Sequence, residues 1–522
     1  MTSRVWWLLA AGGVAICGVL GWSVYLSRAT PAVRVQAPHM VRTRPMKPAF
    51  TEVELQTFLQ EARQAEAIAD PLQRCLAYPE PPGVNWSKDV TAAYCHYGLD
   101  PAINGKDARE LIEHGRVHEL EERLADIKRA QFSEPGAQNK LDRTYNIVFA
   151  DGSDGARALL DAWKRQSPDN PYALAASGSA YVAMAQRQRG SGYAKDTPQA
   201  SFEAMHRLIE LGRDDLDRAA ALDPQMTPAY NAMLMAAGLD SDGAYAADAA
   251  KRALKVDPAS YPVYARLAWM SQPKWGGTVP QMQRVIDQAQ QHASQNPMLR
   301  LLLSERSGGE EYVENCACDP FAEAEMYRHV FAEAAPTRML MRAGWAAQER
   351  RNIALSAIYR SELLRFDPSE LDQRQSRAFL LIELGQTEWG LAEGNTLVKL
   401  APREEDSYDV RGQAYRALGD AAHAAEDFEQ ALRLNPTDTW TLSALGDLYV
   451  NVTHEWDKGW VIANRLLQQS PDEPLGWILR ATIQKSQPRD GLDETIRQFT
   501  ERYGNDPTKQ PVLQQLQAMK SP

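Results

Sequence analysis

Apolar residues recur three and four positions apart along the chain from about residue 50 onward, which is the pattern of amphipathic helices. These helical stretches are short, and many end at a proline, which cannot continue a helix. Pro368, Pro402 and Pro436 are spaced by 34 residues, and the same spacing separates Pro224 from Pro258. A period of this length predicts repeated antiparallel helical hairpins, each of which must stack on its neighbours to bury its apolar face.

Other residue types repeat in register with the prolines. In the unit 405–438, large, small and turn residues occupy regular positions: Tyr408, Gly412, Tyr415, Gly419, Asp420, Ala424, Phe428 and Ala431. Small residues let two helix backbones approach, and large apolar residues fill the space beside them. The pattern resembles the tetratricopeptide repeat (TPR), strongly over 337–472 and in part over 153–297. The resemblance implies an all-α fold, a right-handed α-solenoid of antiparallel helical hairpins.

Two glycine-containing stretches interrupt the register and are predicted to be loops. They are Arg-Gly-Ser-Gly-Tyr at 189–193 and Pro-Lys-Trp-Gly-Gly-Thr at 273–278. In their TPR-like setting they resemble segments of a bacterial family described only as a domain of unknown function. That resemblance covers roughly residues 70–300 and implies no activity.

The N-terminus predicts one transmembrane helix in front of the solenoid. Residues 6–26 carry no charged side chain, and at about 1.5 Å per residue they span a hydrocarbon core of roughly 30 Å. The alternative is a cleaved signal peptide, whose apolar region is normally shorter and is followed by a cleavage site of small residues. The next stretch, 27–50, is rich in proline and arginine and is predicted to be an extended linker.

The remaining pattern completes the predicted organisation. Residues 52–69 and 108–130 are the clearest helices near the N-terminus. The predicted parts are a membrane anchor (1–26), the linker (27–50), an N-terminal helical cap region (51–150), a TPR-like array (151–310), a Cys-containing connection (311–336), a TPR array (337–472) and C-terminal capping helices (473–522).

The charge of the chain argues against a nucleic-acid partner, but the charges that flank the predicted span do not settle on which side of the membrane the body lies. The chain has 57 Lys and Arg against 68 Asp and Glu, a net charge of -11, so we expect no nucleic-acid partner, which would require clustered positive charge. The basic residues after the predicted span favour a cytoplasmic body, whereas the very short head before it favours export. We predict a single-pass protein of a bacterial inner membrane with a periplasmic body, and a cytoplasmic body is the alternative.

Four cysteines lie beyond the predicted span. Cys75 and Cys95 are disulfide candidates if the compartment is oxidising. Cys316 and Cys318 are also disulfide candidates, although this Cys-x-Cys pair also suits thiol exchange or a metal with outside ligands. No second Cys/His pair accompanies it, so an idle or structural pair is the favoured interpretation, and no metal site or cofactor is predicted.

Catalytic signatures are weak. His114 and His118 have the spacing of two metal ligands on one helix face, but the metalloprotease pattern is absent and a solvated face explains the spacing as well. The sequence also has no phosphate-binding loop and no nucleophile elbow. The enzymatic alternative is an envelope enzyme, such as a metal-dependent hydrolase, that builds its active site in the N-terminal helical region from His96, His114, His118 and nearby acids.

The TPR resemblance implies that a protein or peptide binds along the surface formed by the first helix of each hairpin. The family's positions fall here on Met341, Trp345, Gln348, Gln375, Phe379, Asp409, Gln413, Arg416, Trp440, Asp447 and Asn451. Trp345, Phe379 and Trp440 are either binding anchors or rings that pack between neighbouring repeats. The predicted function is a non-catalytic scaffold or adaptor for an unidentified protein, and a subunit of a cell-wall or secretion machine is a further alternative.

Overall fold

The structure is a computed structural model that describes residues 49–99, 103–134, 136–190, 196–306, 326–487 and 489–520. Within these ranges the chain forms helices and turns and contains no strand. The predicted anchor, almost all of the linker, and the pair Cys316 and Cys318 lie outside the described residues. No helix among the described residues is long and apolar enough to cross a membrane.

The chain divides into two compact units between Glu370 and Leu371. We call residues 49–370 the N-terminal unit and residues 371–520 the C-terminal unit. The helices of the N-terminal unit are α2 (Glu52–Glu66), α3 (Pro71–Ala77), α4 (Lys88–Leu99), α5 (Gly105–Glu113), α6 (Val117–Ser133), α7 (Lys140–Val148), α8 (Asp154–Gln166), α9 (Pro171–Arg189), α10 (Gln199–Leu222), α11 (Thr227–Asp240), α12 (Gly243–Val256), α13 (Tyr261–Met270), η2 (Pro273–Trp275), α14 (Val279–Gln290), η3 (Pro297–Leu302), α15 (Leu303–Arg306), α18 (Thr337–Glu349) and α19 (Ile353–Phe366). Those of the C-terminal unit are α20 (Leu371–Glu383), α21 (Thr387–Leu400), α22 (Glu405–Ala417), α23 (Ala421–Leu434), α24 (Thr439–Asp447), η4 (Leu448–Val452), α25 (Trp456–Gln469), α26 (Pro474–Ser486), α27 (Leu492–Tyr503), η5 (Pro507–Lys509) and α28 (Gln510–Ala518).

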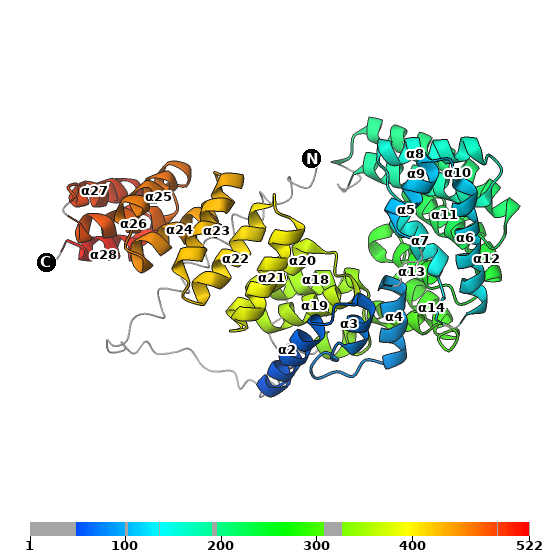
Figure 1. The fold of residues 1–522 in the computed structure, drawn as a ribbon, viewed down its shortest axis with the longest axis horizontal. Helices are drawn as coiled ribbons and strands as arrows, with labels where there is room; N and C mark the ends of the chain where they lie inside the picture. The colour runs from blue at the N-terminus through cyan, green and yellow to red at the C-terminus, as the bar shows by residue number, and fades with distance from the viewer. Residues whose placement is uncertain are drawn as a thin grey trace. The chain divides into compact units, whose positions relative to one another are not determined.

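The hairpin of α22 and α23 shows how the repeat sequence folds. Gly412 lets the two helices approach so closely that a Cβ there would lie 2.8 Å from the ring of Phe428. The turn passes through Gly419 at φ 83°, and the Asp420 side chain caps α23. At the far end the Asn435 N–H bonds back into the helix, and the following proline prevents another turn. Successive hairpins of this kind stack along the C-terminal unit (Figure 1).

The third hairpin of the C-terminal unit departs from regular α geometry. Helix α24 runs directly into a π-helical turn, η4 (Leu448–Val452). The wider turn is closed by the Thr453 N–H, which donates to the Leu448 carbonyl oxygen at 2.9 Å. A π turn rotates the side chains that follow it relative to those before it. It therefore changes the direction of Asn451, one of the predicted partner residues.

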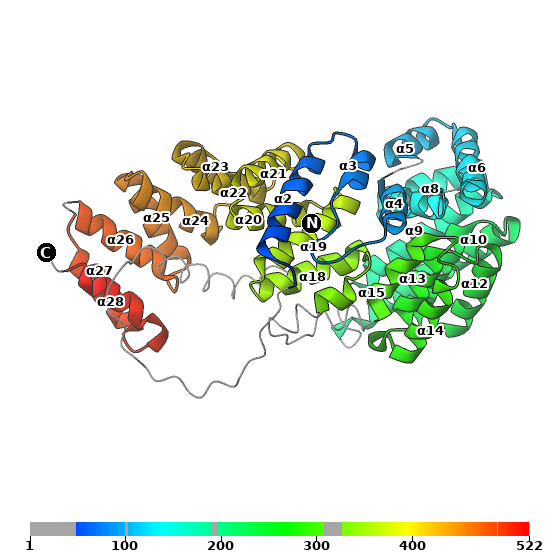
Figure 2. The ribbon, with the colours of Figure 1, turned by 90° about the horizontal axis from the view of Figure 1, so that it is seen from below.

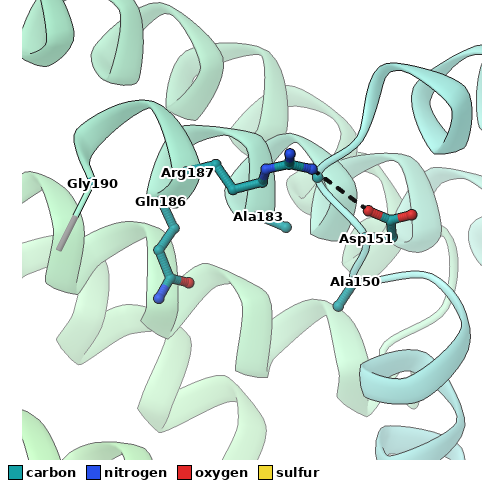
Figure 3. Close-up of a pocket in the computed structure, with 7 residues that line it drawn as sticks. Ala150, Asp151, Ala183, Gln186, Arg187 and Gly190 are labelled. Carbon is teal, nitrogen blue, oxygen red and sulfur yellow. Dashed lines mark ion pairs between the residues drawn. The ribbon is translucent and has the colours of Figure 1, made fainter. Parts of the chain in front are cut away.

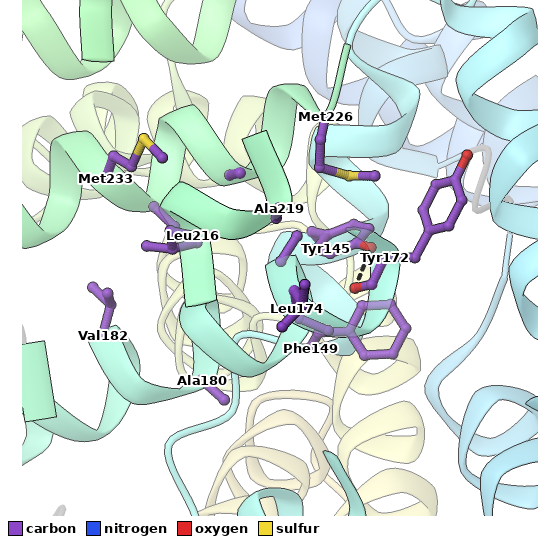
Figure 4. Close-up of a cluster of buried hydrophobic side chains, with 14 of the residues drawn as sticks. Tyr145, Phe149, Tyr172, Leu174, Ala180, Val182, Leu216, Ala219, Met226 and Met233 are labelled. Atoms are coloured by element: carbon purple, nitrogen blue, oxygen red, sulfur yellow. Dashed lines mark hydrogen bonds between the residues drawn. The ribbon is translucent and has the colours of Figure 1, made fainter. Parts of the chain in front are cut away.

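The N-terminal unit buries a continuous apolar core between its helical hairpins. Helices α9 and α10 pack against each other along their length, and a Cβ at Gly178 would lie only 2.5 Å from Leu216 Cγ. Tyr145, Phe149 and Leu174 belong to the same core, and the Tyr145 hydroxyl donates to the Tyr172 carbonyl oxygen at 2.9 Å (Figure 4). The hydroxyl of this buried tyrosine therefore has a partner, as buried polar groups require.

The first described helices pack on the last part of the N-terminal unit rather than on their sequence neighbours alone. Helices α3 and α4 contact α19, and α2 and α3 lie beside α18 and α19 in both views (Figures 1 and 2). The Trp86 indole N–H donates to the Phe331 carbonyl oxygen at 2.8 Å, and the rings of Tyr94 and Phe366 are 4.5 Å apart between centroids. These contacts join segments more than two hundred residues apart in the sequence.

A disulfide lies within this packed region. Cys75 at the end of α3 is bonded to Cys95 in α4, with the sulfur atoms 2.02 Å apart, and both side chains are buried. The Arg365 Nε–H of α19 donates to the Cys75 carbonyl oxygen at 3.0 Å. The bonded pair therefore also supports the contact between α3 and α19.

Candidate functional site: the α20–α22–α24 face

The structure divides the eleven predicted partner residues between the two units. Three of them, Met341, Trp345 and Gln348, belong to α18 in the N-terminal unit. The other eight lie on the first helices of successive hairpins in the C-terminal unit or in the π turn that follows: Gln375, Phe379, Asp409, Gln413, Arg416, Trp440, Asp447 and Asn451.

The three residues on α18 differ in environment. Trp345 is 49% exposed, whereas Met341 packs partly buried against the apolar core of its unit. The Gln348 side-chain oxygen accepts a hydrogen bond from Arg360 Nη2 at 2.6 Å. Trp345 is therefore the one of the three that offers a large accessible apolar surface.

In the C-terminal unit an aromatic pair links the first helix of the first hairpin, α20, to the first helix of the third hairpin, α24. Phe379 of α20 and Trp440 of α24 meet edge to face with ring centroids 5.5 Å apart. Trp440 also contacts Phe428 of α23 at 6.4 Å and still keeps 43% of its surface exposed. The Trp440 ring thus packs between repeats and presents an accessible side. Because this contact spans α20 and α24, we call the surface the α20–α22–α24 face.

Carboxylates gather beside the aromatic pair. Asp409 of α22 is 3% exposed, and its Oδ1 accepts a hydrogen bond from the Thr441 hydroxyl at 2.7 Å. The same hydroxyl also contacts Asp438. A threonine hydroxyl has one proton to donate, so it cannot satisfy both carboxylates at once. Asp438 has further donors, because it caps α24 through the backbone N–H groups of Trp440 and Thr441.

The setting of Asp409 favours its protonated form. Burial raises the pKa of Asp409 to about 8, and the negative charges of Asp438, Asp406 and Glu405 act in the same direction. The hydrogen bond from Thr441 opposes the shift only in part. At neutral pH Asp409 is therefore mostly uncharged. Asp406 and Asp438 of the same face are more accessible than Asp409.

The opposite end of the same face is held by an ion pair. Arg416 of α22 contacts the Asp447 carboxylate of α24, and the Asn451 side-chain amide donates to the other oxygen of Asp447 at 2.6 Å. Gln413, one turn before Arg416, is half-buried. The structure thus brings together three of the predicted residues, Arg416, Asp447 and Asn451. Three further residues of the face were not predicted from the sequence: Asp406, Asp438 and Thr441. Asp438 has a recognisable helix-capping position, but no sequence signal marked Thr441.

The histidines considered for a metal site are separated by a helix break. The sequence predicted one helix over 108–130, which was wrong, because α5 ends at Glu113 and the chain turns at Gly115 with φ 71° before α6 begins. His114 therefore caps α5, with Nδ1 2.7 Å from the Glu110 carbonyl oxygen, whereas His118 is exposed on α6 near Glu122. In the part of the chain that the structure describes, no three His, Cys, Asp or Glu side chains are grouped to hold a metal ion.

A shallow pocket lies at the end of α9. It is lined by Ala150, Asp151, Gly152, Ala183, Gln186, Arg187 and Gly190, and encloses about 480 Å³ (Figure 3). Arg187 and Asp151 form an ion pair across it at 3.9 Å, and both side chains are largely exposed. An exposed pair of this kind is screened by water and contributes little binding energy.

One segment of the chain matches a known family. Residues 406–438 match the tetratricopeptide repeat, and this match covers both helices of the α22–α23 hairpin. The chain therefore contains a tetratricopeptide repeat, which lies within a run of stacked helical hairpins in the all-helical C-terminal unit. No curated protein sequence matches the chain.

Several solved structures are similar to parts of the chain. A TPR protein of Thermus thermophilus is 22% identical, covers 35% of this chain and 98% of its own, and has a TM-score of 0.31. A TPR protein of Parabacteroides merdae is 14% identical, with coverages of 56% and 98% and a TM-score of 0.30. Yeast Tom70 is 12% identical, with coverages of 90% and 86% and a TM-score of 0.30.

Proposed function

We propose that this protein is a non-catalytic scaffold or adaptor that binds a segment of another protein on the α20–α22–α24 face. The observation that carries the proposal is the Phe379–Trp440 pair, in which a large ring is held by its neighbour while much of it faces solvent. Fixed aromatic side chains with accessible area are the usual anchors of protein interfaces, because little conformational entropy is lost when a partner covers them.

The charge of this face indicates the character of the partner segment. Asp438 caps the helix that carries Trp440, and Asp406, Asp409 and Asp438 are close enough to influence one another electrostatically. A lysine or arginine side chain over the Trp440 ring would combine attraction to the ring with attraction to these carboxylates. We infer that the preferred segment contains a basic residue next to an apolar one.

The proposal includes an anchor in a bacterial inner membrane through residues 6–26, with the body in the periplasm. The disulfide between Cys75 and Cys95 supports this location, because such bonds persist in oxidising compartments. A C-terminal alkaline-phosphatase fusion tests it, since this enzyme is active only after export. A second fusion carries a fluorescent protein at the C-terminus. If the phosphatase fusion is inactive and the second fusion is fluorescent, the body lies in the cytoplasm instead.

The binding face is tested by site-specific photocrosslinking in cells. A photoreactive phenylalanine analogue replaces Trp440, and in a matched strain it replaces Val461, an exposed apolar residue on the second helix of a hairpin, α25. The proposal expects a discrete crosslinked protein from position 440 and none from position 461. The same pattern from both positions, or no product from position 440, would contradict the assignment of this face.

A further inference from the structure

The N-terminal unit contains a buried carboxyl group that pairs with no cation among the described residues. Asp142 lies in the first turn of α7 and is 1% exposed. Its Oδ2 accepts a hydrogen bond from the Thr227 hydroxyl at 2.6 Å, whereas its Oδ1 is shielded from solvent and has no donor in the described part of the chain. The neighbouring Arg143 packs instead on the Tyr97 ring of α4, 5.4 Å from the ring centroid. Burying an unpaired carboxylate is costly, so this environment favours the protonated carboxyl.

The hydrogen bonds around Asp142 also join α7 to its neighbours. The Thr227 hydroxyl of α11, which donates to Asp142, accepts a hydrogen bond from Gln131 Nε2 of α6 at 2.9 Å. Gln131 Oε1 in turn accepts a hydrogen bond from the Leu141 backbone N–H at 2.8 Å. These bonds tie the start of α7 to α6 and α11, and the carboxyl of Asp142 is one of their links.

The residue before α7 attaches this helix to another part of the unit. Asn139 is fully buried, and its Oδ1 accepts hydrogen bonds from Asn296 Nδ2 at 2.9 Å and from the Tyr261 backbone N–H at 3.4 Å. Tyr261 belongs to an apolar cluster that includes residues of α4, α13 and η3. Leu141 and Tyr145 of α7 belong instead to the core drawn in Figure 4. Helix α7 therefore connects that core to the neighbouring cluster.

The charged groups near Asp142 do not stabilise its ionised form. Asp257, which precedes α13, accepts a hydrogen bond from Asn139 Nδ2 at 3.5 Å, and His292 after α14 acts on Asp257. Burial, together with the negative charge of Asp257, raises the pKa of Asp142 to about 7. The groups that face Asp142 from the other helices are uncharged at neutral pH: Gln131 of α6, Thr227 of α11 and Tyr97 of α4, whose own pKa is raised by burial. The charged residues of α5, which also packs on α7, are all exposed: Lys106, Asp107, Arg109, Glu110 and Glu113.

We propose that α7 is a proton-controlled latch, which is docked on α6, α11 and the start of α13 while Asp142 is protonated and opens locally when Asp142 ionises. Opening brings the carboxylate into water, where its ionised form is stable. The open state therefore becomes more populated as pH rises from about 4 to about 7. Above this range the population is constant, because Asp142 is then ionised in the docked state as well. The latch lies in the N-terminal unit and does not depend on the function proposed for the α20–α22–α24 face.

Hydrogen–deuterium exchange of the full-length protein, measured by mass spectrometry at about pH 5.5 and about pH 7.5, tests the latch. Dividing each observed rate by the intrinsic rate at that pH gives the opening equilibrium of the amides. For α7 we expect this equilibrium to increase about tenfold or more between the two pH values, because release of one proton changes it up to about tenfold per pH unit. The amides of α9, which belongs to the same core, should show no such increase. In Asp142→Asn the opening of α7 should be equal at both pH values.

The matched control is Asp242→Asn, which changes the N-cap of α12 in the same unit. A hydrogen bond from the Tyr245 backbone N–H lowers the pKa of Asp242, so this group is ionised at both pH values. The opening of α7 in this variant should therefore follow the parent. An opening of α7 that does not change with pH in the parent, or that changes equally in Asp142→Asn, overturns the proposal. Equal increases in α7 and α9 also overturn it, because the whole core would then be opening.

A second variant keeps the proposal testable if Asp142→Asn does not fold by circular dichroism. Thr227→Val removes the hydroxyl whose hydrogen bond opposes the rise in the pKa of Asp142. The increase in the opening of α7 should then extend to higher pH than in the parent. A pH profile identical to that of the parent would overturn the proposal.

Discussion

The hydroxyl of Thr441 in α24 lies 2.7 Å from a carboxylate oxygen of Asp409 in α22, and it is the contact that joins these two helices at a buried acidic group. The same hydroxyl contacts Asp438, so two carboxylates compete for one proton donor. The competition is relieved when Asp409 itself carries a proton. This relationship makes the stability of the repeat array sensitive to pH.

We predict that Asp409→Asn stabilises the protein at neutral and mildly alkaline pH. The pKa of Asp409 is raised from 3.8 to about 8, so the folded chain binds a proton that the unfolded chain has released. The free energy of unfolding contributed by this group therefore falls as pH rises from about 4 to about 8. Asparagine can still accept the hydrogen bond from Thr441 and needs no proton to remain neutral. The variant should therefore be more stable by several kcal/mol at pH 8, since each unit of pKa shift corresponds to about 1.4 kcal/mol.

Chemical denaturation followed by circular dichroism at several pH values measures this effect. The difference between parent and variant should grow with pH across the stated window and disappear near pH 4. Asp506→Asn is the control, because hydrogen bonds from Thr508 lower the pKa of the exposed Asp506, which therefore titrates below the window. A difference that is constant with pH would show that Asp409 is ionised in the folded protein.

A second prediction concerns a buried ion cluster in the first hairpin of the C-terminal unit. Glu393 of α21 accepts from Arg374 Nη1 at 3.0 Å and pairs with Arg377 Nη2 at 2.8 Å, and all three side chains are buried. Glu393→Gln removes the negative charge that both guanidiniums share. We expect a loss of about 3–5 kcal/mol in the free energy of unfolding, as is typical when one partner of a buried pair is removed.

The matched change is Glu494→Gln, which removes a carboxylate paired with Arg497 on the exposed face of α27. Water already solvates this pair, so little change is expected. Urea denaturation of both variants makes the comparison. If the two variants unfold at the same denaturant concentration, the Glu393 cluster does not stabilise the hairpin in the manner described.

The third prediction tests the close approach of α22 and α23. A Cβ at Gly412 would lie 2.8 Å from the Phe428 ring, which is packed and cannot withdraw. Gly412→Ala should therefore cost about 1–3 kcal/mol despite the better helix propensity of alanine. Gly243→Ala, at the start of α12 with no atom within 4 Å, should be neutral or slightly stabilising. Thermal unfolding distinguishes the two, and equal melting temperatures would contradict the packing described.

The fourth prediction concerns the Cys75–Cys95 disulfide, which closes a loop with a sequence separation of 20. Replacing both cysteines with serine should lower the free energy of unfolding by about 3 kcal/mol, because the unfolded chain regains the freedom that the loop removes. Both sulfurs are buried, so thiol reagents should label neither position in the native protein, even after mild reductant. Mass spectrometry after alkylation, with and without denaturant, measures the labelling of the two cysteines. Prompt labelling of the native protein would contradict the prediction.

The sequence by itself determined the hairpin architecture of this protein. The spacing of apolar residues, the turn glycine at Gly419 and the prolines at Pro402 and Pro436 act within a few residues of one another, so their consequences are local and readable. The positions of Phe379 and Trp440 on the first helices of their hairpins followed from the same register.

Only the tertiary structure decided which groups share an environment. The 34-residue period places Asp409 on a helix face, but its burial and its competition with Asp438 depend on how three hairpins stack. Trp86 reaches Phe331 although the two residues are 245 positions apart in the sequence. Burial and charge at such places depend on neighbours that are distant in sequence, and no local pattern records them.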